Sequence, residues 1–132
     1  MVNKLLHPQE IETFYVIPTL RKYLALHMVE ELNMKQKDVA GLLMINSATI
    51  SQYRSNKRAD QLHFNQDLQV EIRKSALLIK DKMSYLREVQ RLLQVIRNSK
   101  ALCDIHRQFS DVPLACEPQA IGCDLIPIRG QL

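Results

Sequence analysis

The chain has 132 residues, of which 46% are hydrophobic and 24% charged, and its formal net charge is +4. This length fits one domain, or one small domain with an appendage, and the hydrophobic content is enough to bury a core. No apolar run approaches the length of a transmembrane helix, and the start of the chain lacks the apolar block of a secretory signal. We therefore expect a cytoplasmic protein with no membrane partner, whose three cysteines are reduced or metal-bound and not paired in structural disulfides.

Two helices are expected at the start of the chain. Ile11, Phe14 and Tyr15 suggest a short first helix. Pro18 can serve as the first residue of a longer helix that runs to about Asn33 and carries apolar residues on one face. We expect the longer helix to be the scaffold against which the short helix packs.

Residues 36–58 indicate a helix, a tight polar turn and a second short helix that ends in a basic cluster. Ala40 is small enough to lie where two crossing helices touch, and Asn46 offers a side-chain oxygen that can cap the second helix. The residues at spacings typical of buried faces are Val39, Leu42, Leu43, Ile50 and Tyr53. The positions expected to be exposed include Ser47, Thr49, Ser51 and Gln52. The alternative is an ordinary helical core, which contains alanine and leucine at similar intervals.

The positive charge of the chain is concentrated in the same segment. Residues 35–58 contain five basic residues and one acidic residue, a surplus of four that equals the surplus of the whole chain. All other segments together are therefore neutral. Neutralising DNA phosphates releases counterions and drives binding, so this distribution favours a DNA-binding surface. A small cluster that arose by chance on a solvated face is the alternative.

The segment 36–58, QKDVAGLLMINSATISQYRSNKR, resembles the helix-turn-helix of Xre-type prokaryotic transcription regulators. Together with the stretch 10–21, EIETFYVIPTLR, it is similar to a group of predicted regulators in archaea and bacteria that carry cysteines after the DNA-binding part. The resemblance covers the first half of the chain well and the remainder in outline. Met44 stands where the turn usually has glycine, so a left-handed backbone there would be strained. Lys35 replaces the usual capping serine or threonine.

The resemblance implies double-stranded DNA as a partner and assigns roles to the polar residues. The first two residues of the recognition helix, and Gln52 one turn later, would face the major groove, where the Gln52 amide can pair with N6 and N7 of adenine. Gln36 matches a phosphate-holding position, and the Lys57–Arg58 pair would clamp the DNA backbone without reading sequence. Thr49 and Ser51 can equally be solvated surface. The expected DNA-binding residues are Gln36, Asn46, Ser47, Ala48, Thr49, Ser51, Gln52, Arg54, Lys57 and Arg58.

Residues 67–100 have a helical pattern with a broad apolar stripe, and the pattern allows a bend near residues 81–84. The stripe consists of Leu68, Ile72, Ala76, Ile79, Leu86, Val89, Leu93 and Ile96. Gln90 would interrupt a strict heptad, so part of the stripe is expected to pack on the protein's own core. The rest could pair two chains, because helix-turn-helix proteins usually read two half-sites as dimers. A face buried entirely within one chain is the alternative.

Cys103, His106, Cys116 and Cys123 lie within 21 residues near the end of the sequence. Three thiolates and one imidazole can bind zinc or an iron-sulfur cluster with mixed ligation. Zinc sites favour paired knuckles and only one close pair is present, so we place the iron-sulfur cluster ahead of zinc. A cluster would make this segment a redox sensor. The alternative is no metal, with the cysteines as small buried hydrophobic residues and His106 at a helix end.

These observations predict an all-α protein: a small helical bundle with a helix-turn-helix in residues 1–66, a long helix or helix pair for dimerisation in 67–100, and an irregular cysteine-containing segment in 101–132. The expected function is sequence-specific transcription regulation by a homodimer, without catalysis or a small-molecule substrate. A plain regulator or an antitoxin, with structural zinc or no metal, is the alternative. A thiol enzyme using Cys103 with His106 as base is less favoured, because no orienting third residue or glycine-rich oxyanion loop accompanies the pair.

Overall fold

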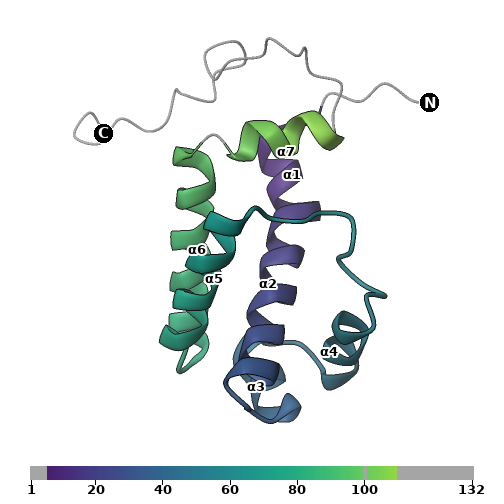
Figure 1. The fold of residues 1–132 in the computed structure, drawn as a ribbon, viewed down its shortest axis with the longest axis vertical. Coiled ribbons are helices and arrows are strands. Elements are labelled where there is room, and N and C mark those ends of the chain that lie inside the picture. Colours follow the sequence, from purple (N-terminus) through teal and green to yellow (C-terminus); the bar gives the residue numbers. More distant parts are fainter. Residues whose placement is uncertain (1–5, 100, 110–132) are drawn as a thin grey trace.

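The chain folds around one long helical column at its amino end (Figure 1). This computed structural model describes residues 6–99 and 101–109. The column consists of four consecutive segments: α1 (Pro8–Ile11), the π-helical η1 (Glu12–Val16), α2 (Ile17–Leu26) and the π-helical η2 (His27–Glu31). Every regular element in the described ranges is helical, so the prediction of an all-α fold is confirmed.

Pro18 lies in the first turn of α2, one residue after α2 begins, but the backbone continues from η1 without a break, so the prediction of two separate helices is wrong. Proline has no N–H, and its ring clashes with the carbonyl four residues earlier in an α-helix. The chain passes through a π-helical turn just before it, where the Ile17 N–H donates to the Glu12 carbonyl five residues back. The Thr19 hydroxyl also donates to the Tyr15 carbonyl at 2.7 Å. The wider turn lets the helix continue past the proline, and the two expected helices become one.

Two short helices, α3 (Gln36–Leu43) and α4 (Ser47–Arg54), pack against α2 and against each other. The three residues between them form the tight turn that the sequence predicted. Met44 ends α3 in the left-handed conformation, with φ 57° and ψ 42°. Asn46 caps α4, because its side-chain oxygen accepts the Thr49 backbone N–H at 2.9 Å. Lys35 precedes α3 without a side-chain cap.

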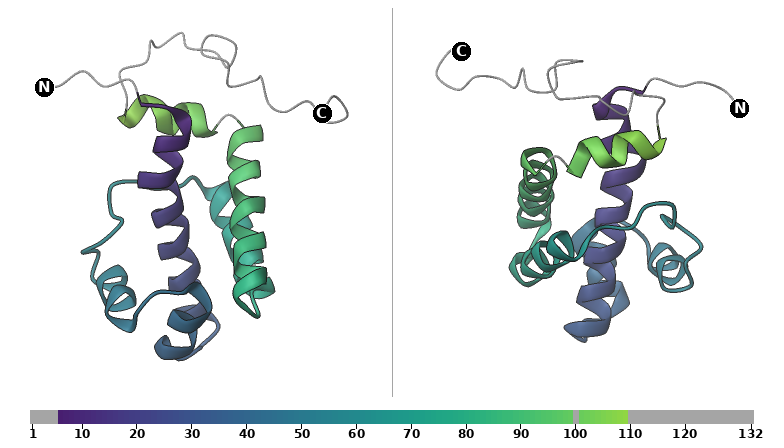
Figure 2. Two further views of the ribbon diagram at one scale, coloured as in Figure 1. Left: turned by 180° about the vertical axis from the view of Figure 1, so that it is seen from behind. Right: turned by 45° about the horizontal axis from the view of Figure 1, so that its top comes forward.

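A helical hairpin follows, formed by α5 (Gln66–Leu78) and α6 (Lys82–Asn98), which lie side by side in Figures 1 and 2. The bend that the sequence allowed near residues 81–84 is a complete reversal of direction. It is fixed by a capping box: the Ser84 N–H donates to the Asp81 carboxylate at 2.7 Å, and the Asp81 N–H donates to the Ser84 hydroxyl at 3.0 Å. A last helix, α7 (Ala101–Phe109), lies across the amino end of the column and contacts α1 and α6.

The apolar stripe of the hairpin is mostly core of the single chain. Its buried members are Leu68, Ile72, Ala76, Ile79, Val89, Leu93 and Ile96. Only Leu86, with 46% of its surface exposed, remains open to solvent. The stripe therefore matches the intrachain alternative at seven of its eight positions, and of the stripe only Leu86 is left for contact with a second chain.

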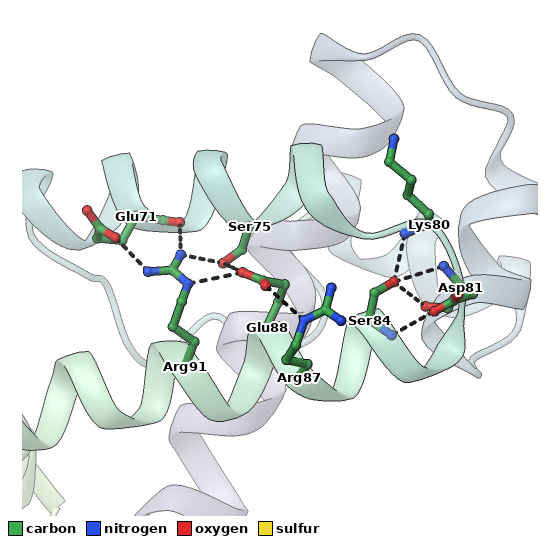
Figure 3. Close-up of polar contacts among 8 residues, drawn as sticks. All are labelled: Glu71, Ser75, Lys80, Asp81, Ser84, Arg87, Glu88 and Arg91. Carbon is green, nitrogen blue, oxygen red and sulfur yellow. Dashed lines mark hydrogen bonds and ion pairs between the residues drawn. The ribbon is translucent and has the colours of Figure 1, made fainter.

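A polar cluster between α5 and α6, drawn in Figure 3, fixes the pairing of the hairpin. Glu88 is 4% exposed and accepts hydrogen bonds from the Ser75 hydroxyl at 2.8 Å and from Arg91 Nε at 3.0 Å. Arg91 also donates to the Glu71 carboxylate at 2.8 Å. Burial raises the pKa of Glu88, but the hydrogen bonds from Arg91 and Ser75 outweigh it and hold this pKa below its ordinary value. The carboxylate is thus kept charged inside the hairpin.

The column is also joined to α6 by polar contacts at two levels. Arg97 donates to both carboxylate oxygens of Glu12, at 2.7 Å and 2.9 Å, and Glu12 is 6% exposed. Arg21 Nε donates to the Tyr85 hydroxyl at 3.0 Å. The first contact involves η1 and the second α2, so both ends of α6 are tied to the column.

Candidate nucleic-acid interface

Helix α4 has one buried face and one open polar face. Its buried residues are Thr49, Ile50 and Tyr53, which pack toward α2 and α3. Its exposed residues are Ser47, Ala48, Ser51 and Arg54, and Gln52 is partly exposed. No described part of the chain covers the open face. This face therefore presents two serines, one alanine and one arginine, together with the partly exposed amide of Gln52.

Thr49 departs from the sequence prediction. It was expected on the exposed face as a DNA-binding residue, but it is 7% exposed. Its hydroxyl donates to the Asn46 side-chain oxygen at 3.0 Å, beside the bond from its own N–H. The third residue of a helix points back toward the cap, and the hydroxyl follows the backbone N–H to the same acceptor. Thr49 therefore strengthens the cap of α4, and the expectation that it contacts DNA is wrong.

Gln36 links the first residue of α3 to the exposed side of α4. Its amide nitrogen donates to the Ser47 carbonyl at 3.1 Å and to the Ser51 hydroxyl at 3.0 Å. Its amide oxygen accepts a hydrogen bond from Arg54 at 3.2 Å. Four of the expected DNA-binding residues are therefore brought together. In the free protein the Gln36 amide is engaged in holding α4.

Acidic residues lie closer to this surface than the count of charges in residues 35–58 implied. Arg54 Nε lies 3.7 Å from a carboxylate oxygen of Glu30, which belongs to η2 in the preceding column. The basic residues of the segment are all exposed: Lys35, Lys37, Arg54, Lys57 and Arg58. The cationic character of the surface therefore remains, but Arg54 is partly neutralised by a residue that is distant in sequence.

The loop after α4, which carries Lys57 and Arg58, is held in place by a buried lysine. Lys22 of α2 is 3% exposed, and its ammonium donates to the Asn56 side-chain oxygen at 2.9 Å and to the Ala59 carbonyl at 3.5 Å. Asn56 and Ala59 both have positive φ, so the loop turns sharply at two points. Lys22 thus holds the loop that carries the two basic residues after α4. The sequence pattern did not predict the burial of Lys22, because that burial depends on other elements covering the column on more than one side.

Tyr53 is a core residue, as expected. It is 2% exposed, and burial raises the pKa of its hydroxyl, while the neighbouring Arg21 and Arg58 act in the opposite direction. The same Arg21 is bonded to Tyr85 of α6. The back of α4 therefore packs near a junction of the column and the hairpin.

The expected metal ligands are only partly within the described chain. Cys103 is a free thiol of intermediate exposure on α7, and His106 on the same helix is 4% exposed. The His106 Nε2 atom lies 2.6 Å from the Leu6 carbonyl, so the imidazole ties α7 to the residues before α1. Among the described residues, no three His, Cys, Asp or Glu side chains are grouped to hold a metal ion. Cys116 and Cys123 lie outside the described residues.

Comparisons with protein-family models, curated proteins and solved structures find no match for this chain. Across residues 6–99 and 101–109, no helix has the length and apolar character required to cross a membrane. The function is therefore inferred from the geometry of α3, α4 and the loop that follows them.

Proposed function

We propose that the protein is a transcription regulator that inserts α4 into the major groove of double-stranded DNA. One observation carries the proposal: the open face of α4 is mostly polar and uncovered by the described chain, and exposed basic residues stand at the start of α3 and directly after α4. The major groove of B-DNA, about 12 Å wide, admits an α-helix. The opposite face of α4 is braced by α2 and α3.

Each part of the surface has a separate task in this proposal. Gln52 reads a base edge, with adenine as the base that an amide pairs with best. Lys57 and Arg58 bind phosphates and set the position of the helix, as do Lys35 and Lys37 at the start of α3. Gln36 holds the orientation of α4 through its bonds to Ser47 and Ser51 and is a positioning residue before DNA arrives.

A second copy of the chain is the expected protein partner. Four large apolar side chains are exposed around the turn of the hairpin: Leu77 (60%), Leu78 (50%), Met83 (73%) and Leu86 (46%). We call these four residues the hairpin patch. Clustered exposed apolar residues mark interaction surfaces, and two DNA half-sites require two recognition helices. Replacing Leu77 and Met83 by lysine should lower the dimer fraction in sedimentation while leaving the helical content unchanged.

The proposal also places the protein in the cytoplasm, with no catalytic reaction.

The test of DNA binding starts from a random-sequence duplex pool, from which the purified protein selects its own site. Selection of a common sequence is expected. Gln52→Ala should then cost about 1 to 3 kcal/mol at one base pair, and the doubly substituted K57Q/R58Q protein should bind all sequences more weakly. The matched control is K80Q/K82Q, which removes two exposed cations from the hairpin turn. If no sequence is enriched, or if both double variants weaken binding equally, the assignment to α4 is wrong.

The role of the cysteine segment is a separate proposal, and its alternatives are an iron-sulfur cluster, zinc or no metal. The described residues supply two of the four expected donors, and one nitrogen of His106 is already bonded to a backbone carbonyl. Purification without air, followed by metal analysis and a visible absorption spectrum, separates the three cases. A colourless protein without metal leaves a regulator that does not sense redox state through these residues.

A further inference from the structure

A cavity of about 280 Å³ lies between the column and the loop that follows α4. Phe14, Tyr15 and Pro18 of the column form one side. Lys57 and Arg58 of the loop form part of the other side. The cavity therefore combines an apolar wall with two cations that also belong to the proposed DNA surface.

The apolar wall presents aromatic surface that residues 6–99 and 101–109 leave uncovered. Phe14 is 61% exposed, although phenylalanine is normally among the buried residue types. The neighbouring Tyr15 ring is fixed by stacking on Phe109 of α7, with ring centroids 4.0 Å apart. An engineered apolar cavity of about 150 Å³ binds benzene, so this larger space admits a ligand of one or two rings.

The charge of the cavity favours an anion. Lys57 and Arg58 carry two positive charges, and Asp60 is the single carboxylate among the lining residues. Within the described residues, the side chains of Lys57 and Arg58 form no ion pair. The loop that carries them is held by Lys22, so both cations line the cavity, and in the described part of the chain no carboxylate pairs with either of them.

We infer that this cavity binds a small aromatic carboxylate, whose ring lies against Phe14 and whose carboxylate pairs with Lys57 and Arg58. The ligand takes the cations that the proposed function assigns to DNA phosphates, so its binding releases DNA. The proposal that the ligand binds here depends only on the shape and charge of the cavity. The regulatory effect rests on the proposed function.

The first experiment measures ligand binding without DNA. Full-length protein is titrated with 1-naphthoate and with its neutral analogue 1-naphthamide, and binding is followed by calorimetry and by amide chemical shifts. The amide is expected to bind about tenfold more weakly, because it carries no negative charge and cannot form an ion pair with Lys57 and Arg58. Equal binding of both compounds would overturn the requirement for an anion, and no binding of naphthoate would overturn the site.

Substitutions locate the binding in the cavity. Phe14→Ala removes an exposed ring and should weaken naphthoate binding about three- to tenfold. The matched control is Met83→Ala, which removes another exposed apolar side chain, 73% exposed, far along the chain in the hairpin. The K57Q/R58Q protein should bind naphthoate and naphthamide with nearly the same affinity. Unchanged naphthoate affinity in the Phe14→Ala protein would place the ligand elsewhere and overturn the inference.

The second experiment tests the coupling to DNA. Naphthoate at about ten times its own dissociation constant should raise the apparent dissociation constant for the selected DNA about tenfold, as for a competitor. The Phe14→Ala protein should bind DNA as the unsubstituted protein does but require more naphthoate to release it. Binding of naphthoate with no effect on bound DNA would overturn the regulatory role. A protein that binds naphthoate and no DNA at all would refute the proposed function and leave the cavity site standing.

Discussion

Replacing Glu30 by glutamine should strengthen DNA binding. Glu30 lies 3.7 Å from Arg54, and both side chains are about half exposed, 52% and 50%. Exposed ion pairs of this kind contribute roughly 0.2 to 1 kcal/mol. If DNA binding must break the pair, its removal should raise affinity about 1.5- to 5-fold for each bound protomer. The hydrogen bond from Arg54 to Gln36 remains and keeps the guanidinium on the same side of α4.

The assay is fluorescence anisotropy with the selected DNA over a range of salt concentrations. Because salt screens an exposed ion pair, the gain in affinity of the Glu30 variant should be largest at low salt and should shrink as the salt concentration rises. The matched control is Glu31→Gln, which removes the neighbouring carboxylate that pairs with His27 and Arg73 away from α4. Equal gains for the two variants would show a general effect of net charge. A loss of affinity in the Glu30 variant would refute the role assigned to Arg54.

Three further substitutions test the supports of the site and the fold. Glu88→Gln should lower the free energy of unfolding by about 2 kcal/mol at neutral pH, since it weakens two hydrogen bonds to a charged acceptor. Because the pKa of Glu88 is depressed in the folded state, urea titrations should show this difference vanishing as the pH falls through that pKa. A difference that does not depend on pH would refute the argument that the charge of Glu88 matters. Asn46→Ala should cost about 1 kcal/mol and expose the start of α4 to hydrogen exchange, whereas unchanged protection would contradict the cap. Lys22→Met should leave the core packed but free the loop of residues 55–61, seen as faster amide exchange at Lys57 and Arg58; slow exchange there would contradict the role of Lys22.

The sequence predicted those features of the fold that are determined by residues close together in the chain. The cap at Asn46 and the turn at Met44 are properties of a few consecutive residues, and both are observed where expected. The apolar spacing along residues 67–100 predicted helix correctly, because periodicity reports which face is buried. It did not distinguish a bend from a reversal, since one buried stripe fits both.

Features that depend on contacts distant in sequence were not predictable. Glu30, Lys22 and Gln36 acquire their roles from partners 11 to 37 positions away. Thr49 was predicted to be exposed from the spacing of the apolar residues, and that spacing does not report a hydroxyl that turns back to the Asn46 cap. Pro18 was taken as a helix start because the π-helical turn before it leaves no mark in the apolar pattern.

If the protein binds DNA as a dimer, as proposed, the contacts between the column and α6 would restrict how that dimer adapts to DNA. Arg97 to Glu12 and Arg21 to Tyr85 join the hairpin to the same helix that braces α4. The hairpin patch and the open face of α4 are therefore both connected to the column by side-chain contacts within the described residues. In a dimer built through that patch, the distance between the two α4 helices would be fixed by the structure of each protomer. Such a dimer would bind weakly to operators whose half-sites are a few base pairs farther apart. DNA of that kind would have to bend or twist to match the fixed spacing of the two helices.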